Sequence, residues 1–299
     1  MRNLRFSFFV LLLLLVQGIN TKVAATVVYG INKFLADGGA SFRVTMSDVR
    51  VAEANSAYIA NAGETGGSSG SETCCLTATY ATDELAKRLA PVLKKQKGEL
   101  ASWAQLIDAA ADQQVHLQVL TEHNKPEGFF QYMVWAAAVS VVELDVLTCA
   151  HQLLSVDILY DVGRPLMPVI DLGQIEGGFM IGVGGCTSEE VAEDEDTGEL
   201  LSKGSWDYHI PTAGDIPQRF NVALLPNAPN PRGVLSSKAT AEPPVMLSAS
   251  VHQALRECVA SVRRDNGRDE WFDWPSPATP LKMLALCGAA KTDGSAGSI

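Results

Sequence analysis

The chain has 299 residues, of which 47% are hydrophobic and 19% are charged, so it can bury a sizeable core and is globular. Its formal net charge of −11 excludes a protein that binds nucleic acid or an anionic membrane through clustered lysine and arginine. An anionic ligand would therefore have to be held by backbone amides and a few local side chains.

The first 16 residues, MRNLRFSFFVLLLLLV, have two arginines followed by an apolar run. This is the form of a secretory signal peptide, and the run is too short to span a bilayer. The same residues would also result if intron sequence had been translated by mistake. We expect an apolar leader over residues 1–16, a folded domain over residues 17–288 and a disordered tail over residues 289–299.

The six cysteines and five histidines show no metal-binding spacing, so we expect no metal held by protein side chains. The cysteines also suggest no disulfide framework. We therefore expect a reduced, cytoplasmic protein; secretion or membrane anchoring is the alternative if residues 1–16 act as a signal.

Apolar residues recur every three or four positions over residues 17–35, which predicts an amphipathic helix, and a short strand is expected over residues 49–54. Residues 61–71 form a glycine- and serine-rich loop. It leads into a long helix over residues 72–97, which Pro91 is expected to kink or interrupt. Such a loop presents amides and hydroxyls suited to a phosphate; the alternative is an ordinary loop with Ser71 as the helix cap.

A helix over residues 100–111 precedes two paired strands, over residues 132–145 and 153–160. Residues 170–190 are rich in small side chains and predict a closely packed helix, with Gln174 near its start. This glutamine is either a structural hydrogen-bonding group or a ligand contact. An acidic turn within a hairpin ending at residues 208–210, and then a strand over residues 220–225, follow.

Pro243 and Pro244 mark the start of a helix that runs over residues 245–262, because proline is tolerated in the first helical turn. Glu242 therefore lies at the positive end of a helix dipole, and the prolines make the backbone beside it rigid. It is either an N-terminal cap or a functional carboxylate. A final short helix follows the proline-rich residues 275–280.

Six motifs together resemble the C-terminal molybdenum-cofactor-binding domain of the xanthine dehydrogenase and aldehyde oxidase family. The resemblance extends from about residue 17 to about residue 287. It implies an α+β fold with mixed sheets flanked by helices and two subdomains lining a cofactor cleft. The motifs are QGINTKVA (17–24), TGGSSGSE (65–72), VVELDVLT (141–148), DVGRPLMPVIDLGQIEGGF (161–179), YHIPTAGDIPQRFNV (208–222) and SSKATAEPPVMLSASVH (236–252).

The resemblance implies that Glu242, which matches the glutamate of the family's GEPP motif, is the catalytic base. It also implies a molybdenum-molybdopterin cofactor, whose metal is held through the pterin and takes no ordinary protein ligand. The residues that match the family's cofactor-binding positions are Gln17 with Gly18, Gly67, Ser68, Ser69 and Gln174.

The sequence departs from the family pattern at three positions. Ala241 replaces the glycine before the catalytic glutamate, so a positive φ at this position would strain the loop. Cys149 stands where a hairpin glycine is usual, and Ile181 stands where glutamine is usual.

By resemblance, the enzyme oxidises aldehydes or N-heterocycles such as purines with water-derived oxygen. Its first molybdenum subdomain, its 2Fe-2S domains and an FAD domain are expected outside these residues, and the full-length enzyme is expected to be a homodimer. The isolated chain is expected to be inactive. The alternative is a truncated remnant that binds the cofactor at most.

Overall fold

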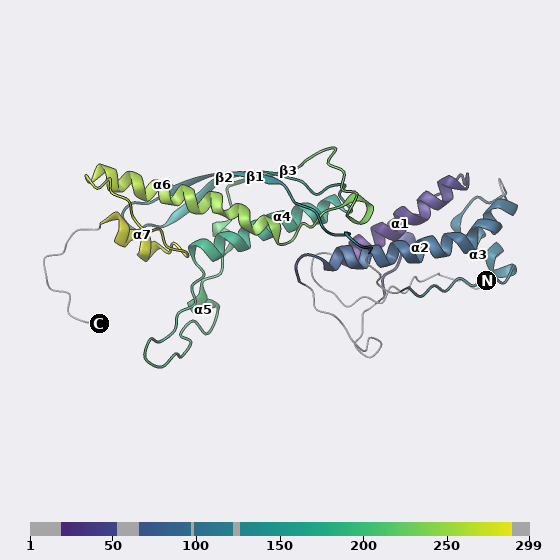
Figure 1. Ribbon diagram of the computed structural model, residues 1–299, viewed down its shortest axis with the longest axis horizontal. Helices are drawn as coiled ribbons and strands as arrows, with labels where there is room; N and C mark the ends of the chain where they lie inside the picture. The colour runs from purple at the N-terminus through teal and green to yellow at the C-terminus, as the bar shows by residue number, and fades with distance from the viewer. Residues whose placement is uncertain (1–18, 53–65, 97–98, 122–125, 289–299) are drawn as a thin grey trace. The chain divides into compact units, whose positions relative to one another are not determined.

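The computed structural model describes residues 19–52, 66–96, 99–121 and 126–288 (Figure 1). The chain divides into two compact units, and the boundary passes through helix α4 (Pro168–Thr187). Unit 1 comprises Met1–Met133, Val162–Asp171 and Asn227–Ala239, and unit 2 comprises Val134–Asp161, Leu172–Pro226 and Thr240–Ile299.

Unit 1 is built from three α-helices: α1 (Ile19–Asp37), α2 (Gly70–Lys95) and α3 (Trp103–Asp112). Helix α1 packs along α2. Of the apolar residues whose spacing predicted this helix, Val23, Val27 and Ile31 are buried, and Val28 and Phe34 are half-buried. Short 3-10 turns complete the unit at η1 (Met46–Asp48) and η3 (Val234–Ser236).

In unit 1 the predicted strand is wrong, and of the two outcomes expected at Pro91, a kink or an interruption, the interruption does not occur. Residues 49–52 form no strand, and η1 ends immediately before them; positions 53 and 54 lie outside the described residues. Helix α2 is not interrupted at Pro91 but continues to Lys95, because the last turn packs through buried Val92 and Leu93. Tertiary packing thus outweighs the cost of a proline near the helix end.

Unit 2 contains a three-stranded mixed sheet in the order β1-β2-β3. Strand β1 (Ala136–Leu144) pairs antiparallel with β2 (His151–Tyr160), as the hairpin prediction required. Strand β3 (Arg219–Leu224) lies parallel to β2, so the chain needs a crossover between them, and this crossover contains α4. The helix-plus-strand class predicted from the sequence is confirmed.

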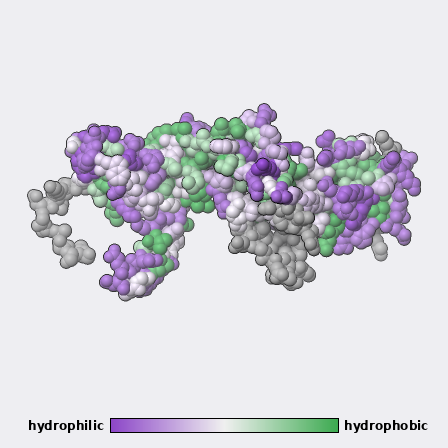
Figure 2. Space-filling model, viewed as in Figure 1, coloured by the Kyte–Doolittle hydropathy of each residue, from purple (hydrophilic) through white to green (hydrophobic). Residues whose placement is uncertain are grey.

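Helix α6 (Ala249–Asp265) packs against β1, where the hydroxyls of Ser140 and Ser250 are hydrogen-bonded at 2.7 Å. Alternate residues of the strands point the other way and leave exposed Val139 and Val141 on β1. Figure 2 shows hydrophobic residues at the surface of unit 2. Helix α7 (Pro280–Cys287) packs against α6.

The acidic hairpin of unit 2 is shorter than predicted: a single antiparallel bridge joins Glu193 and Leu200, and the one-turn helix α5 (Ser205–Tyr208) follows. A further 3-10 turn, η2 (Ala213–Asp215), precedes β3. In the described part of the chain, no helix has the length and apolar character needed to cross a membrane.

Candidate cofactor-binding site

The glycine/serine loop of unit 1 ends directly at the first turn of α2. Gly67 has φ 60° and is exposed, and no heavy atom of the described residues lies within 4 Å of a Cβ atom added there. Ser68 also adopts a positive φ, 54°, and is 3% exposed. The first amides of a helix have no intrahelical acceptor, so this turn presents N–H groups and open space to an anion.

Ser69, not Ser71, is the N-cap residue of α2. Its hydroxyl does not cap the helix but donates to the carbonyl of Gly66 at 3.0 Å, and so closes the loop on itself. Ser71 lies inside the helix, which begins at Gly70, so the predicted alternative of a cap at Ser71 is wrong.

A buried glutamate lies on the first turn of the same helix. Glu72 is 5% exposed, and its carboxylate accepts a hydrogen bond from the hydroxyl of Tyr132. The same hydroxyl accepts the backbone N–H of Ala239 at 2.9 Å. Three segments that are distant in sequence therefore meet at one tyrosine side chain.

A buried ion pair lies close to this glutamate. The ammonium of Lys22 on α1 is 2.7 Å from the carboxylate of Asp171, and both side chains are almost completely buried. Cys75 feels the charges of Lys22, Asp171 and Glu72; burial is the largest effect and raises the pKa of its thiol to about 11. A polar cluster thus lies inside the apolar core beneath α2.

In unit 2, α4 presents small residues to the segment that carries Glu242. A Cβ on Gly178 would come within 2.5 Å of the carbonyl oxygen of Ala241, and one on Gly182 within 2.3 Å of that of Val245. Gln174 precedes Gly178 by one helical turn on the same face and is half-buried. The structure therefore places Gln174 one turn away from the contact with Ala241.

Glu242 is exposed and occupies the N-cap position of the 3-10 helix η4 (Pro243–Ser248). Its side chain makes no capping hydrogen bond, which removes the simple cap interpretation. The predicted α-helix begins later, as α6 at Ala249, because the double proline is followed first by the tighter 3-10 turn.

The structure accounts for two departures from the family pattern. Ala241 is not among the residues with positive φ, so its side chain causes no strain before Glu242. Cys149 does adopt φ 54°, the left-handed conformation that a hairpin glycine would take easily. Ile181 is exposed on α4. Gln17 and Gly18 lie outside the described residues.

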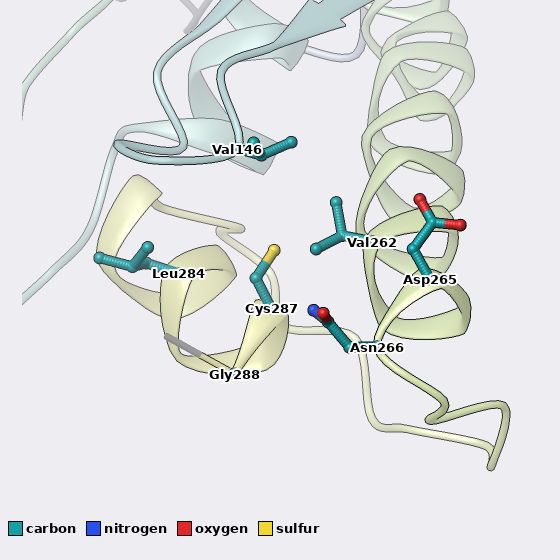
Figure 3. A pocket seen from close by; sticks show the side chains of 7 residues that line it. All are labelled: Val146, Val262, Asp265, Asn266, Leu284, Cys287 and Gly288. Atoms are coloured by element: carbon teal, nitrogen blue, oxygen red, sulfur yellow. The ribbon is translucent and has the colours of Figure 1, made fainter. Parts of the chain in front are cut away.

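A separate hollow of about 310 Å³ lies in unit 2, between α6, α7 and the turn after β1 (Figure 3). The thiol of Cys287 faces this hollow and lies 4.0 Å from the sulfur of Cys149. The hollow is lined by Val146, Val262, Asp265, Asn266, Leu284, Cys287 and Gly288. None of the predicted site residues contributes to it.

Comparison with known proteins shows the family directly. A family model described as the molybdopterin cofactor-binding domain matches residues 15–217, and the chain belongs to this family. It is 38% identical over 279 residues to a probable aldehyde oxidase 3 of Oryza sativa subsp. japonica, and 37% identical over 280 residues to an indole-3-acetaldehyde oxidase of Arabidopsis thaliana. These alignments cover 91% of this chain but 20% and 21% of the relatives.

The same fold occurs in the quinoline 2-oxidoreductase of Pseudomonas putida 86. The structures share a TM-score of 0.70 at 20% sequence identity, over 93% of this chain and 36% of that one. At this identity the likeness shows the fold alone. The fold and family expectations drawn from the six motifs are therefore confirmed, and the chain spans about a fifth of the length of its curated relatives.

Sequence reasoning missed the polar residues that support the loop. Lys22 lies directly before Val23 of the buried α1 stripe, and Glu72 was considered only as the start of a helix. A charged residue at the edge of an apolar stripe was the available signal for a buried partner. Tyr132 gave no such signal, because its partners are 60 and 107 positions away.

Proposed function

We propose that this chain is the second molybdenum-cofactor-binding part of a molybdenum hydroxylase that oxidises aldehydes with water-derived oxygen. The observation that carries the proposal is the family match together with the aldehyde oxidases aligned over 91% of the chain. N-heterocycles remain the second substrate class. The 2Fe-2S and FAD groups and the homodimer expected for such an enzyme belong to the proposal for the full-length protein.

We infer that the loop at α2 holds the anionic end of the molybdenum-molybdopterin cofactor. The fit is chemical: open space at Gly67, the turn at Ser68 and Ser69, and the N-terminus of helix α2 suit a phosphate in a protein of net charge −11. Gln174 and Gln17 would supply carboxamide groups, which can both donate and accept hydrogen bonds to a pterin edge.

We assign the role of general base to Glu242. Its carboxylate is exposed, and the following prolines fix the backbone that carries it. When bound, the cofactor would supply the electron acceptor for the oxidation, while the protein supplies the proton acceptor. A carboxylate held rigidly at an open position is suited to taking up a proton.

A cofactor-binding remnant without turnover is the second candidate. It is supported by the extent of the match, because this chain aligns with 20% of the length of a curated relative. A cytoplasmic location is also part of the proposal. All six cysteines are free, as a reducing compartment would keep them.

The proposal is tested by measuring molybdenum and pterin in the purified 299-residue chain, produced in cells that make the cofactor. We expect close to one molybdenum atom per chain. Gly67→Ala should lower this occupancy at least about fivefold, because its Cβ would enter the space assigned to the ligand. Gly128→Ala is the control, since Gly128 has a similar φ of 71° and lies outside the loop.

Absence of molybdenum from the wild-type chain would overturn the cofactor assignment, and equal occupancy in the two alanine variants would overturn the role of the loop. Glu242→Gln should keep the molybdenum content. In the full-length enzyme that contains this chain, it should lower kcat by at least about 100-fold, the usual contribution of a general base. Retained turnover would exclude Glu242 as the base.

A further inference from the structure

The hydroxyl of Tyr132 lies between two groups that flank the proposed chemistry. It donates to the carboxylate of Glu72 and accepts the N–H of Ala239 at 2.9 Å. Glu72 follows the loop residue Ser69 by three positions, and Ala239 precedes Glu242 by three positions. The proposed base and the proposed anion loop are therefore each a few residues from one side chain.

The backbone before Glu242 is held on its other side by main-chain hydrogen bonds. The N–H of Arg164 donates to Ser236 at 2.7 Å, and the N–H of Lys238 donates to Val162 at 2.9 Å. Gly163 pairs with Ser237 in the same antiparallel bridge and leaves no room for a Cβ, which would lie 2.1 Å from the carbonyl of Ser236. Ala239, just after this bridge, is held by the Tyr132 hydroxyl.

A hydrogen bond from a hydroxyl to a buried carboxylate is stronger than one between neutral groups, and it polarises the hydroxyl oxygen that accepts the Ala239 amide. Ala239 is the last residue of unit 1 and precedes Glu242 by three positions in the chain. Movement of the first turn of α2 would be transmitted to this segment through Tyr132.

We propose that Tyr132 is a positioning residue, whose hydroxyl couples occupancy of the loop at α2 to the backbone that leads to Glu242. The coupling rests on the proposed function, because that function supplies the ligand for the loop. Linkage makes the coupling reciprocal: if loading of the loop stabilises the segment held by Tyr132, stabilising that segment favours loading by the same factor. The tyrosine need not touch the cofactor or the substrate.

Hydrogen–deuterium exchange of the 299-residue chain, followed by mass spectrometry over residues 236–242, tests the anchor without a ligand. We expect Tyr132→Phe to speed exchange of this segment at least about tenfold. Glu72→Gln should preserve slow exchange, since an amide oxygen still accepts from the tyrosine. Tyr29→Phe is the matched control, because its hydroxyl accepts from the guanidinium of Arg164 at 3.0 Å, whereas it is the backbone N–H of Arg164 that holds Ser236.

The second arm compares the chain with and without bound molybdenum cofactor. Loading should slow exchange over residues 236–242 in the wild type and in Tyr29→Phe, and should leave it unchanged in Tyr132→Phe at equal molybdenum content. A merely structural tyrosine would not separate these responses.

Unchanged exchange in the empty Tyr132→Phe chain, or the same response to loading in both tyrosine variants, would overturn the inference. If the wild type binds no molybdenum, the proposed function fails, and the anchor is still decided by the first arm. If Tyr132→Phe does not fold by circular dichroism, Glu72→Leu against Glu72→Gln makes the same comparison: faster exchange in the leucine variant supports the anchor, and equal exchange overturns it.

Discussion

Lys22 and Asp171 form a buried ion pair within the polar cluster that lies in the apolar core of unit 1. Taking two charges out of water is costly, and their attraction offsets this cost only while both are present. The pair fixes α1 to the first turn of α4 within unit 1. A single substitution should therefore be far more damaging here than at the surface.

Asp171→Asn should lower the free energy of unfolding by about 3–5 kcal/mol, because the buried Lys22 ammonium would lose the carboxylate that lies 2.7 Å from it. Asp157→Asn is the control: Asp157 pairs with Arg219 at 3.2 Å, but their side chains are 50% and 64% exposed. Exposed pairs contribute about 0–1 kcal/mol. Urea unfolding measures both variants, and similar small losses would show that the buried pair is not important.

The Tyr132 hydroxyl is the second consequential group at this scale. Its importance comes from the two partners it joins, Glu72 and Ala239, and not from its own burial, which is intermediate. Its replacement by phenylalanine removes one oxygen atom and no apolar surface. The exchange experiment therefore isolates the hydrogen bonds from packing.

At the scale of elements, the glycines of helix α4 matter because they have no side chains. Gly178 and Gly182 let the helix approach the backbone of residues 241–245, whereas Gly177 and Gly185 face open space. This close approach holds the backbone of Glu242 against helix α4, which also carries Gln174, within unit 2. Small residues that look alike in the sequence thus have different roles.

Gly178→Ala should destabilise the chain by about 1–3 kcal/mol, because the new Cβ would lie 2.5 Å from the Ala241 carbonyl and force backbone movement. Gly177→Ala should stabilise it by up to about 1 kcal/mol, since alanine is the better helix former and the site is open. Thermal and urea unfolding measure the stability of both variants. Similar changes in the two variants would contradict the predicted contact.

At the scale of the whole molecule, all six cysteines are free, and each of them is buried or half-buried. Burial is the largest effect on the adjacent pair: it raises the pKa of Cys74 to about 12 and that of Cys75 to about 11. The unfolded chain loses these protons near pH 9, while the folded chain retains them. The contribution of the neutral thiols to the free energy of unfolding is therefore fully present below pH 9 and is lost as the pH rises above 9.

Raising the pH from about 9 to about 11 should lower the free energy of unfolding by about 1.4 kcal/mol per pH unit for each of these thiols. Urea unfolding under reducing conditions measures the slope for the wild type and for the double variant Cys74→Ala, Cys75→Ala. The variant should show a flatter slope over this range. Equal slopes would mean that the two thiols do not titrate differently on unfolding.

Much of the fold follows from local sequence patterns. The apolar spacing of α1, the valine-rich strands β1 and β2 and the double proline before η4 were each readable within about 20 residues. The predictions that differ from the structure concern segments where the local sequence preference and the tertiary packing disagree. Pro91 lies inside α2 because buried neighbours hold the last turn, and residues 49–52 find no partner strand.

For the candidate site, the sequence by itself determined the residue types and their order: the glycine/serine loop before α2, Gln174 near the start of α4, and Glu242 before two prolines. Tertiary structure alone decided the support of these groups. Tyr132 meets Glu72 and Ala239 across 60 and 107 positions. Hydrogen bonds and close packing depend on distance in space, which no local periodicity encodes.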